Sequence, residues 1–394
     1  GNPSGTEYAV TTDEGTSWVD RSTKTTTTEV KWDSNLTGWG YKNILSNTMY
    51  SIRVKARNVD LVETRLSATS SARTPSIQLT PPNNFVVTAE SETSLRYTWT
   101  DSTTNETGFR ILDTNGNVKV LADANVLTTT ESGLSVNTAY GRTIEAYSAD
   151  GRATGEGITR YTSIEASGGG TWEGITATSI TIHSSNEPSN LSLGESKIIF
   201  KNVTKNTSVE TRSNTWASSG LSANTGYNFT ITTKNGDEII RSTVDAGTKY
   251  TSIEAPVSAT WEITTGSITI HSSNEPSNLS SGESGIYFRN VTAETNSTWI
   301  RTNTWTSSGL TKNASYEFSI TTKNGDGLIG GTLSGISRYT SAETPLVPTV
   351  VGTVDGSNNF NCRVTVNGNG NPGYTEYAVT TDEGVTWINW ETRA

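Results

Sequence analysis

Two long stretches of the chain occur twice, and this duplication constrains the fold more than any other feature. The segment SITIHSSNEPSNLS is identical at 179–192 and 267–280. Further on, NTWASSGLSANTGYNFTITTKNGD at 214–237 corresponds to NTWTSSGLTKNASYEFSITTKNGD at 303–326. Recurrence at this spacing is the signature of tandem structural repeats.

Similar exit sequences mark the boundaries of the repeats. RYTSIEAS at 160–167, KYTSIEAP at 249–256 and RYTSAETP at 338–345 each close a unit, and ARTPS at 72–76 closes an earlier one. We therefore predict five parts: a partial unit with later strands at 1–75, complete units at 76–164, 165–253 and 254–343, and a partial unit with early strands at 344–394.

Within each unit the apolar residues alternate with polar ones. SLRYTWT places Leu95, Tyr97 and Trp99 on one face, and the YNFTIT and YEFSIT segments repeat the pattern. Such alternation is typical of strands with one buried and one solvated face. The pairs Asn115–Gly116, Asn235–Gly236, Asn324–Gly325 and Asp150–Gly151 predict tight turns with positive φ. The sequence thus predicts an all-β chain of antiparallel sandwiches in tandem.

The motif TEYAVTTDEG occurs at both ends of the chain, at 6–15 and 375–384. Two interpretations fit: a window from a longer array, or a subunit that donates strands to its neighbours. Both partial units carry the same strand, and this redundancy favours the window. In either case we expect further copies of the same chain as partners, in a homopolymer or a longer array.

Charge and cysteine content exclude several classes of protein. The 394 residues carry a formal net charge of −10, which argues against a nucleic-acid partner, because such surfaces are built on clustered Lys and Arg. A single Cys excludes an internal disulfide scaffold. No apolar run reaches membrane-spanning length, so no membrane insertion is expected.

The segment 76–164 resembles the fibronectin type III repeat. The matching motifs are Trp99, then Gly108-Phe109-Arg110, then LSVNTAY at 134–140. The resemblance extends to nearly the whole chain and implies Ig-like sandwiches of an extracellular, prokaryotic surface or fibre protein. It also implies tyrosine corners, in which the hydroxyl bonds to upstream backbone; the candidates are Tyr50, Tyr140, Tyr227 and Tyr316.

The duplicated units depart from the family pattern on their second strand. Ser184 and Ser272 stand where Trp99 does, and Trp172 and Trp261 on the first strand are candidates to fill that volume. In the 76–164 unit, Arg142 stands where the sister units have Phe229 and Phe318.

No catalytic or metal-binding site is expected. His183 and His271 are the same position in two repeats, and the alternation turns both outward. The adjacent acids Asp13–Glu14 and Asp382–Glu383 fit hairpin turns. The repeated NEPSN could offer Ca²⁺ only Glu187 or Glu275 with Asn carbonyls, which falls short of the roughly six to eight oxygens that Ca²⁺ prefers. We therefore expect no catalytic residue and no cofactor.

The aromatic residues and the sequons raise the question of glycans. Trp99, Trp216 and Trp305 fit core positions, which leaves Trp32 and Trp39 as the best exposed pair for a sugar ligand. Core packing is the favoured role of most Trp. Asn-x-Ser/Thr sequons permit glycosylation at Asn190, Asn202, Asn228, Asn278, Asn290 and Asn313. The alternation in FNCRVTV predicts a buried Cys362.

These patterns together predict a non-enzymatic structural segment of an extracellular filament, surface layer or stalk. The alternative functions are a carbohydrate- or host-binding adhesin region, or an accessory segment of a secreted polysaccharide-degrading enzyme.

Overall fold

The computed structural model describes residues 6–11, 19–21, 45–56, 62, 64–369, 377–379, 384 and 388–390. It divides into two compact units. Unit 1 comprises Gly1–Glu165, Ser189–Ser196 and Lys234–Ile239, and unit 2 comprises Ala166–Pro188, Lys197–Thr233 and Ile240–Ala394. Within these described residues every regular element is a β-strand, and no helix has the length and apolarity that a membrane span requires. The predicted all-β class is confirmed.

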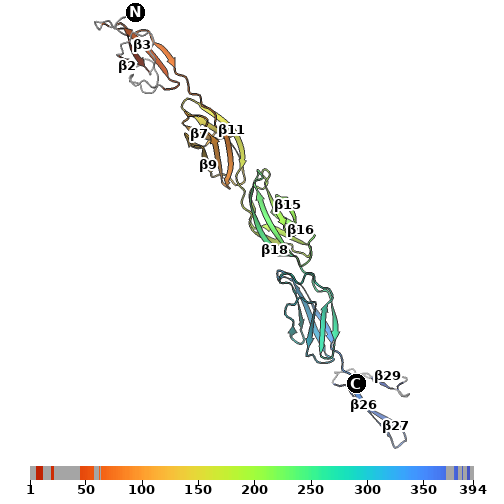
Figure 1. The fold of residues 1–394 in the computed structure, drawn as a ribbon. Helices are drawn as coiled ribbons and strands as arrows, with labels where there is room; N and C mark the ends of the chain where they lie inside the picture. The colour runs from red at the N-terminus through yellow and green to blue at the C-terminus, as the bar shows by residue number, and fades with distance from the viewer. Residues whose placement is uncertain are drawn as a thin grey trace. The chain divides into compact units, whose positions relative to one another are not determined.

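The segment 76–164 in unit 1 forms two antiparallel sheets (Figure 1). A three-stranded sheet has the order β5-β6-β9, and a four-stranded sheet has the order β11-β10-β7-β8. The strand bounds are β5 (Asn83–Ser91), β6 (Ser94–Thr100), β7 (Gly108–Asp113), β8 (Val118–Asp123), β9 (Thr128–Ser132), β10 (Ala139–Tyr147) and β11 (Arg152–Tyr161).

The inner faces of these two sheets form one hydrophobic core. Leu95, Tyr97 and Trp99 of β6 are buried, as their alternation predicts. The Trp99 ring packs against Phe109 of β7 with centroids 5.3 Å apart. Burying rings of this size contributes most of the stabilisation of a small sandwich.

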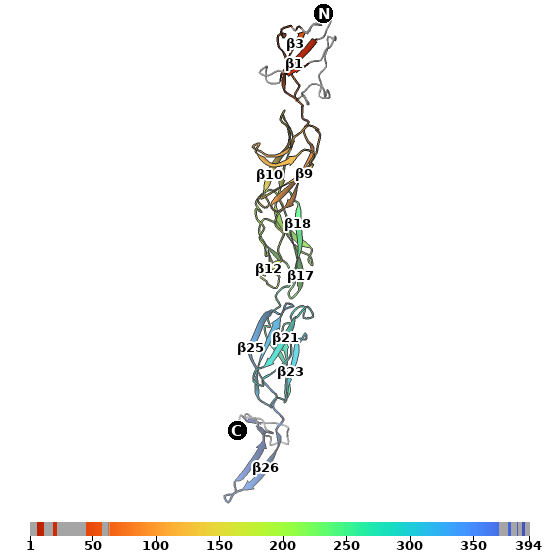
Figure 2. The ribbon, with the colours of Figure 1, turned by 90° about the vertical axis from the view of Figure 1, so that its left-hand side faces the viewer.

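The segments 165–253 and 254–343 each repeat the arrangement of a three-stranded and a four-stranded sheet. Their sheet orders are β12-β13-β16 with β15-β14-β17-β18, and β19-β20-β23 with β22-β21-β24-β25 (Figure 2). The strands of the first are β12 (Gly170–Glu173), β13 (Ser179–Ser184), β14 (Lys197–Asn202), β15 (Thr207–Thr211), β16 (Thr215–Ser219), β17 (Gly226–Lys234) and β18 (Ile240–Tyr250). Those of the second are β19 (Ala259–Ile263), β20 (Ser267–Ser272), β21 (Gly285–Asn290), β22 (Thr295–Asn296), β23 (Thr304–Ser308), β24 (Ser315–Lys323) and β25 (Ile329–Tyr339).

The first-strand Trp residues pack on the cores of these two repeats. Trp172 meets Phe229 edge-on at 5.2 Å between centroids, and Trp261 meets Phe318 at 5.3 Å. The same spacing joins Trp99 to Phe109 in the 76–164 segment. Each sandwich therefore contains a Trp–Phe contact at this spacing, although the Trp comes from β6 in the 76–164 segment and from β12 or β19 in the other two. In the 165–253 repeat Trp216 also packs against Phe229, at 6.2 Å between centroids.

The segments near the two ends contain partial sets of strands. In unit 1, β1 (Thr6–Thr11), β2 (Val19–Arg21), β3 (Met49–Ala56) and β4 (Ser70–Arg73) form one sheet of order β2-β1-β3-β4. In unit 2, β26 (Leu346–Val354) pairs with β27 (Phe360–Asn367), and β28 (Tyr377–Val379) pairs with β29 (Ile388–Trp390). The YAV residues of this repeated motif thus lie on a strand in both places, in β1 and in β28.

The prediction of a buried Cys362 is wrong. The residue lies on β27 and is exposed, as are its neighbours Phe360 and Val364. In the described part of the chain β26 and β27 pair only with each other, so no second sheet covers either face of the hairpin.

Candidate functional site

Each of the four predicted tyrosines accepts a hydrogen bond from a backbone N–H five residues earlier in the chain. The four donors are Leu45, Ser135, Ser222 and Thr311, at 2.8 to 2.9 Å. Tyr50, Tyr227 and Tyr316 are buried, whereas Tyr140 is half-buried. This geometry fixes the loop that leads into β3, β10, β17 and β24.

An Asn three residues before each Tyr adopts positive φ in this loop. The φ angles of Asn47, Asn137, Asn224 and Asn313 lie between 44° and 48°. Asn is one of the few residues other than Gly that adopts this left-handed conformation readily. At two of the four positions, Asn137 and Asn224, the side chain is buried and bonds to loops of the following repeat; we call each of these contact regions a junction.

In unit 1, Asn137 lies at the centre of the first junction and is fully buried. Its Nδ2 donates to the carbonyl of Asn190 at 3.0 Å and to Ser196 Oγ at 2.9 Å. Its Oδ1 accepts from the backbone N–H of Gly236 at 3.1 Å. One side chain therefore connects β10's entry loop to two loops that lie 50 to 100 positions away in sequence.

In unit 2, Asn224 makes the corresponding contacts and is also fully buried. Its Nδ2 donates to the carbonyl of Asn278 at 3.0 Å, and its Oδ1 accepts from Ser284 Oγ at 2.9 Å and from Gly325 N at 3.0 Å. A buried amide with all its hydrogen bonds satisfied specifies geometry, because any displacement leaves polar groups unpaired.

Three further contacts recur in both junctions. The backbone N–H of Tyr161 donates to Asp237 at 2.8 Å, and that of Tyr250 donates to Asp326 at 3.0 Å. In the second recurring contact, Asn235 Nδ2 donates to Thr162 O in the first junction and Asn324 Nδ2 donates to Thr251 O in the second. In the third, Asn190 Nδ2 donates to Val136 O and Asn278 Nδ2 donates to Ala223 O. The two junctions are thus built from equivalent residues of successive repeats.

The glycines of the two junctions are required by close packing. A Cβ on Gly236 would lie 2.4 Å from the Tyr161 ring, and one on Gly325 would lie 2.2 Å from the Tyr250 ring. Neither glycine has positive φ, although Gly116 does. The prediction that these pairs mark positive-φ turns is therefore right at 115–116 and wrong at 235–236, 324–325 and the Asp–Gly pair at 150–151.

The acidic residue Glu254 adds to the second junction. Its carboxylate accepts from the Ser277 N–H at 3.0 Å and from the Ser277 hydroxyl at 2.6 Å. Burial acts to raise the pKa of Glu254, but the hydrogen bonds from Ser277 outweigh it and hold the pKa below its usual range. In unit 1, Glu165 accepts from Ser189 N in the same way.

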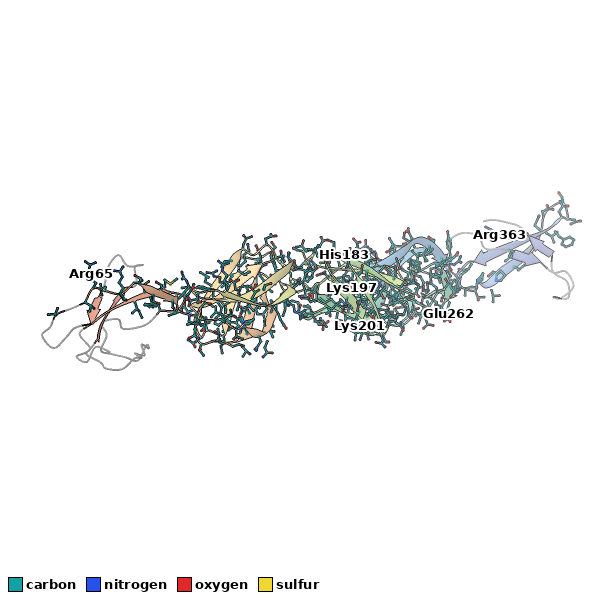
Figure 3. All side chains as sticks on the ribbon, turned by 90° about the horizontal axis from the view of Figure 1, so that it is seen from above. Arg65, His183, Lys197, Lys201, Glu262 and Arg363 are labelled. Atoms are coloured by element: carbon teal, nitrogen blue, oxygen red, sulfur yellow. The ribbon has the colours of Figure 1, made fainter. Side chains whose placement is uncertain are left out.

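His183 and His271 each lie beside a glutamate of the adjacent strand. His183 Nε2 is 2.8 Å from Glu173 Oε1, without meeting the geometry of a hydrogen bond, and His271 Nε2 is 3.6 Å from Glu262 Oε1. Their side chains are 27% and 31% exposed, so they are half-buried on the face opposite the core. His183 and Glu262 lie on different repeats (Figure 3).

The described residues contain no group of three or more His, Cys, Asp or Glu that could hold a metal. Glu187 is exposed, and the second Asn of each NEPSN, Asn190 or Asn278, donates to a junction carbonyl. Other candidates, at Asp13–Glu14, Trp32, Trp39 and Asp382–Glu383, lie outside the described residues.

Two of the six sequons are inaccessible in the folded protein. Asn202 and Asn290 are fully buried, and their Nδ2 atoms donate to Ser218 at 3.1 Å and Ser307 at 3.0 Å. A glycan cannot be accommodated on either nitrogen. Asn228 and Asn313 are half-buried, and Asn190 and Asn278 belong to the junctions.

The 76–164 segment carries a buried charged cluster that its sister repeats lack. Arg142 donates to both carboxylate oxygens of Glu131 at 2.8 Å, and the Tyr97 hydroxyl donates to Glu131 at 2.5 Å. Burial acts to raise the pKa of Glu131, but the hydrogen bonds from Arg142 and Tyr97 outweigh it and lower the pKa. Burial and the Glu131 contact raise the pKa of Tyr97 above its usual range.

The 254–343 repeat carries a surface aromatic cluster of Trp299, Tyr287 and Lys323. The Trp299 and Tyr287 rings lie 5.4 Å apart, and the Lys323 ammonium lies 4.8 Å from the centre of the Trp299 ring. Trp299 is 40% exposed. The sister repeat has Ile199 in place of Tyr287, so this cluster is specific to one repeat.

No family model and no curated protein sequence matches the chain. Among solved structures, the chain is similar to a two-domain fibronectin type III segment from chicken tenascin, at 17% identity and a TM-score of 0.32, covering 43% of this chain and 99% of that one. It is also similar to the FN1–FN3 domains of chicken CNTN1, at 13% identity and a TM-score of 0.24, covering 66% of this chain and 98% of that one. The resemblance to tandem fibronectin type III repeats thus recurs in the comparison of structures.

Proposed function

We propose that the chain is a non-catalytic structural segment of an extracellular filament, surface layer or stalk, with domains at 76–164, 165–253 and 254–343. The observation that carries the proposal is the recurrence of one junction. Asn137 and Asn224 make equivalent buried contacts with the repeat that follows. A binding module needs no such junction, whereas a spacer requires each domain to be held against the next.

The hydrogen bonds of each junction would resist bending between neighbouring repeats. Each junction combines several buried hydrogen bonds, each with a net contribution of about 1 kcal/mol, and breaking one partner of a buried pair costs more than that. Sideways bending at Asn224 would separate it from Gly325 and Ser284 together. The domains therefore resist bending at the points where a flexible linker would yield.

The test is single-molecule stretching of the full chain and of a variant with Asn137→Gly and Asn224→Gly. Glycine tolerates the positive φ at both positions, so the loop conformation is retained. We expect a shorter persistence length in the variant, with unchanged unfolding forces for the individual sandwiches. The proposal fails if the bending stiffness of the two chains is the same.

We propose that the partner is another copy of the same chain, which binds the exposed apolar residues of the β26–β27 hairpin. Val347 and Phe360 are 90% and 88% exposed, and burial of apolar area is favourable by about 25 cal/mol per Å². Velocity sedimentation should show association that weakens with Phe360→Ser. The control is Val257→Ser, which removes an apolar residue of 73% exposure elsewhere in unit 2. Equal effects of both substitutions would contradict a specific contact.

The second candidate function is carbohydrate binding, favoured by the Trp299–Tyr287 pair. Exposed aromatic rings stack on sugar faces, and such a site could serve an adhesin or an accessory segment of a polysaccharide-degrading enzyme. A glycan array with the full chain distinguishes the two candidates. Binding that is lost in both Trp299→Ala and Tyr287→Ile, the latter being the sister-repeat residue, would favour the binding function over the purely structural one.

A further inference from the structure

Each junction buries an Asn–Gly pair, the dipeptide most prone to spontaneous deamidation. In this reaction the backbone nitrogen of the glycine attacks Cγ of the Asn side chain and expels ammonia, forming a five-membered succinimide. Water then opens the ring to Asp or isoaspartate. Glycine favours the attack because it has no side chain to hinder it. Asn235 and Asn324 are 1% and 2% exposed.

The packing of the junction constrains the residue type at both positions of the Asn–Gly pair. The glycine is required because the Tyr161 or Tyr250 ring occupies the place of a Cβ. The amide is required because Asn235 Oδ1 accepts from the N–H groups of Asp237 and Ile239, at 3.1 and 2.9 Å, while its Nδ2 donates to Thr162 O at 3.2 Å, which a carboxylate cannot do. Asn324 accepts equivalently from Asp326 and Leu328. The junction therefore retains a chemically labile pair.

The same junction blocks the reaction. The attacking nitrogen of Gly236 donates its proton to Asn137 Oδ1 at 3.1 Å, and that of Gly325 donates to Asn224 Oδ1 at 3.0 Å. The amide that would leave is held as well, because Asn324 Nδ2 donates to Thr251 O at 3.1 Å. Nucleophile and leaving group are thus each bound by the preceding repeat.

We propose that Asn235–Gly236 and Asn324–Gly325 are latent modification sites, at which deamidation proceeds only when the junction opens. Opening frees the glycine nitrogen and admits water, and the net reaction converts amide and water to carboxylate and ammonium. The new carboxylate cannot donate to Thr162 O or Thr251 O, and a buried charge facing a carbonyl is strongly unfavourable. A junction whose Asn has been deamidated therefore does not close again. Deamidation thus makes a transient opening of the junction permanent.

The test is peptide mapping by mass spectrometry of the full chain, incubated at mildly alkaline pH, with and without Asn224→Gly. Removing the Asn224 side chain abolishes several buried hydrogen bonds, which should raise the open population and the deamidation rate at Asn324 by about tenfold or more. Asn235 should be unaffected and serves as the internal control. The reciprocal variant Asn137→Gly should accelerate Asn235 and leave Asn324 unchanged.

A reference rate comes from the exposed Asn115–Gly116 turn, where the Gly116 N–H is bonded only within the turn. In the wild-type chain Asn115 should deamidate well before Asn235 or Asn324. Equal rates at the three sites would overturn the proposal, as would an unchanged rate at Asn324 in Asn224→Gly. Hydrogen exchange of β24 shows whether the repeat stays folded in that variant. If it unfolds, Ser284→Ala replaces it, because that change removes one junction bond and should accelerate Asn324 alone.

Discussion

Replacing Arg142 in the buried cluster of Glu131, Arg142 and Tyr97 should destabilise the 76–164 sandwich strongly. Arg142 and Glu131 are 6% and 8% exposed, and they form a two-bond pair inside the 76–164 sandwich. Arg142→Phe introduces the residue of the sister repeats but leaves the Glu131 carboxylate buried with Tyr97 as its remaining donor within the cluster. Breaking a buried pair in this way costs about 3–5 kcal/mol of folding free energy.

The sister repeats also show how the loss can be reversed. They have Ser218 and Phe229 where this segment has Glu131 and Arg142, with Ile182 where it has Tyr97. The triple variant Tyr97→Ile, Glu131→Ser, Arg142→Phe removes the buried charge together with its partners. Replacement of a whole buried pair by residues of the sister core is close to neutral, so most of the stability should return.

Hydrogen exchange of the full chain, followed by mass spectrometry, resolves the effect on this sandwich from effects on the others. Amides of β6 should exchange roughly a hundredfold to a few thousandfold faster in Arg142→Phe, since each 1.4 kcal/mol corresponds to about tenfold. They should recover in the triple variant, and β13 amides should not change in either. The reasoning is refuted if Arg142→Phe leaves β6 protected, or if the triple variant is no better than the single one.

Three further predictions concern individual polar contacts. Tyr227→Phe removes the bond from Ser222 N and should destabilise the 165–253 repeat by about 1 kcal/mol, measured as faster exchange of β17 amides; no change would contradict a tyrosine corner there. The lowered pKa of Glu131 means that its stabilisation is complete above the ordinary glutamate value of 4.5 and is lost as pH falls through the lower folded value. Acid titration of β6 exchange should show this loss in wild type and not in Glu131→Ser. Asn202→Ala leaves the buried Ser218 hydroxyl without its amide donor and should cost about 1–3 kcal/mol, seen in β16 exchange, whereas an unchanged rate would show that the pair is dispensable.

The sandwiches could be predicted from the sequence because short stretches of the chain are enough to identify their strands and their repeats. Alternation of Leu95, Tyr97 and Trp99 identifies a buried face without knowledge of its partner strand. The duplicated sequences define the repeats in the same way. Cys362 was mispredicted for a related reason: alternation predicts a buried face, but burial depends on a second sheet, and no described strand covers β27.

The junctions could not be predicted from local pattern. Asn137 and Asn224 stand in the motif that identifies the tyrosine corner, yet their partners lie in another repeat. A signal was present, because the NEPSN and KNGD loops are identical in the two repeats, although loops usually diverge. The Glu131–Arg142 pair offered a weaker signal: Arg142 breaks the apolar pattern of β10, but the sequence does not show which acid lies opposite.

The distance distribution between spin labels on either side of the second junction shows whether the junction holds the two repeats in one arrangement. Ser208→Cys and Ser308→Cys place labels on exposed strand positions of the two repeats, with Cys362→Ser removing the native thiol. We expect one narrow distance distribution in this background and a broad one when Asn224→Gly is added. An equally broad distribution in both would show that the junction does not hold the repeats together, and would contradict the structural role proposed for this chain.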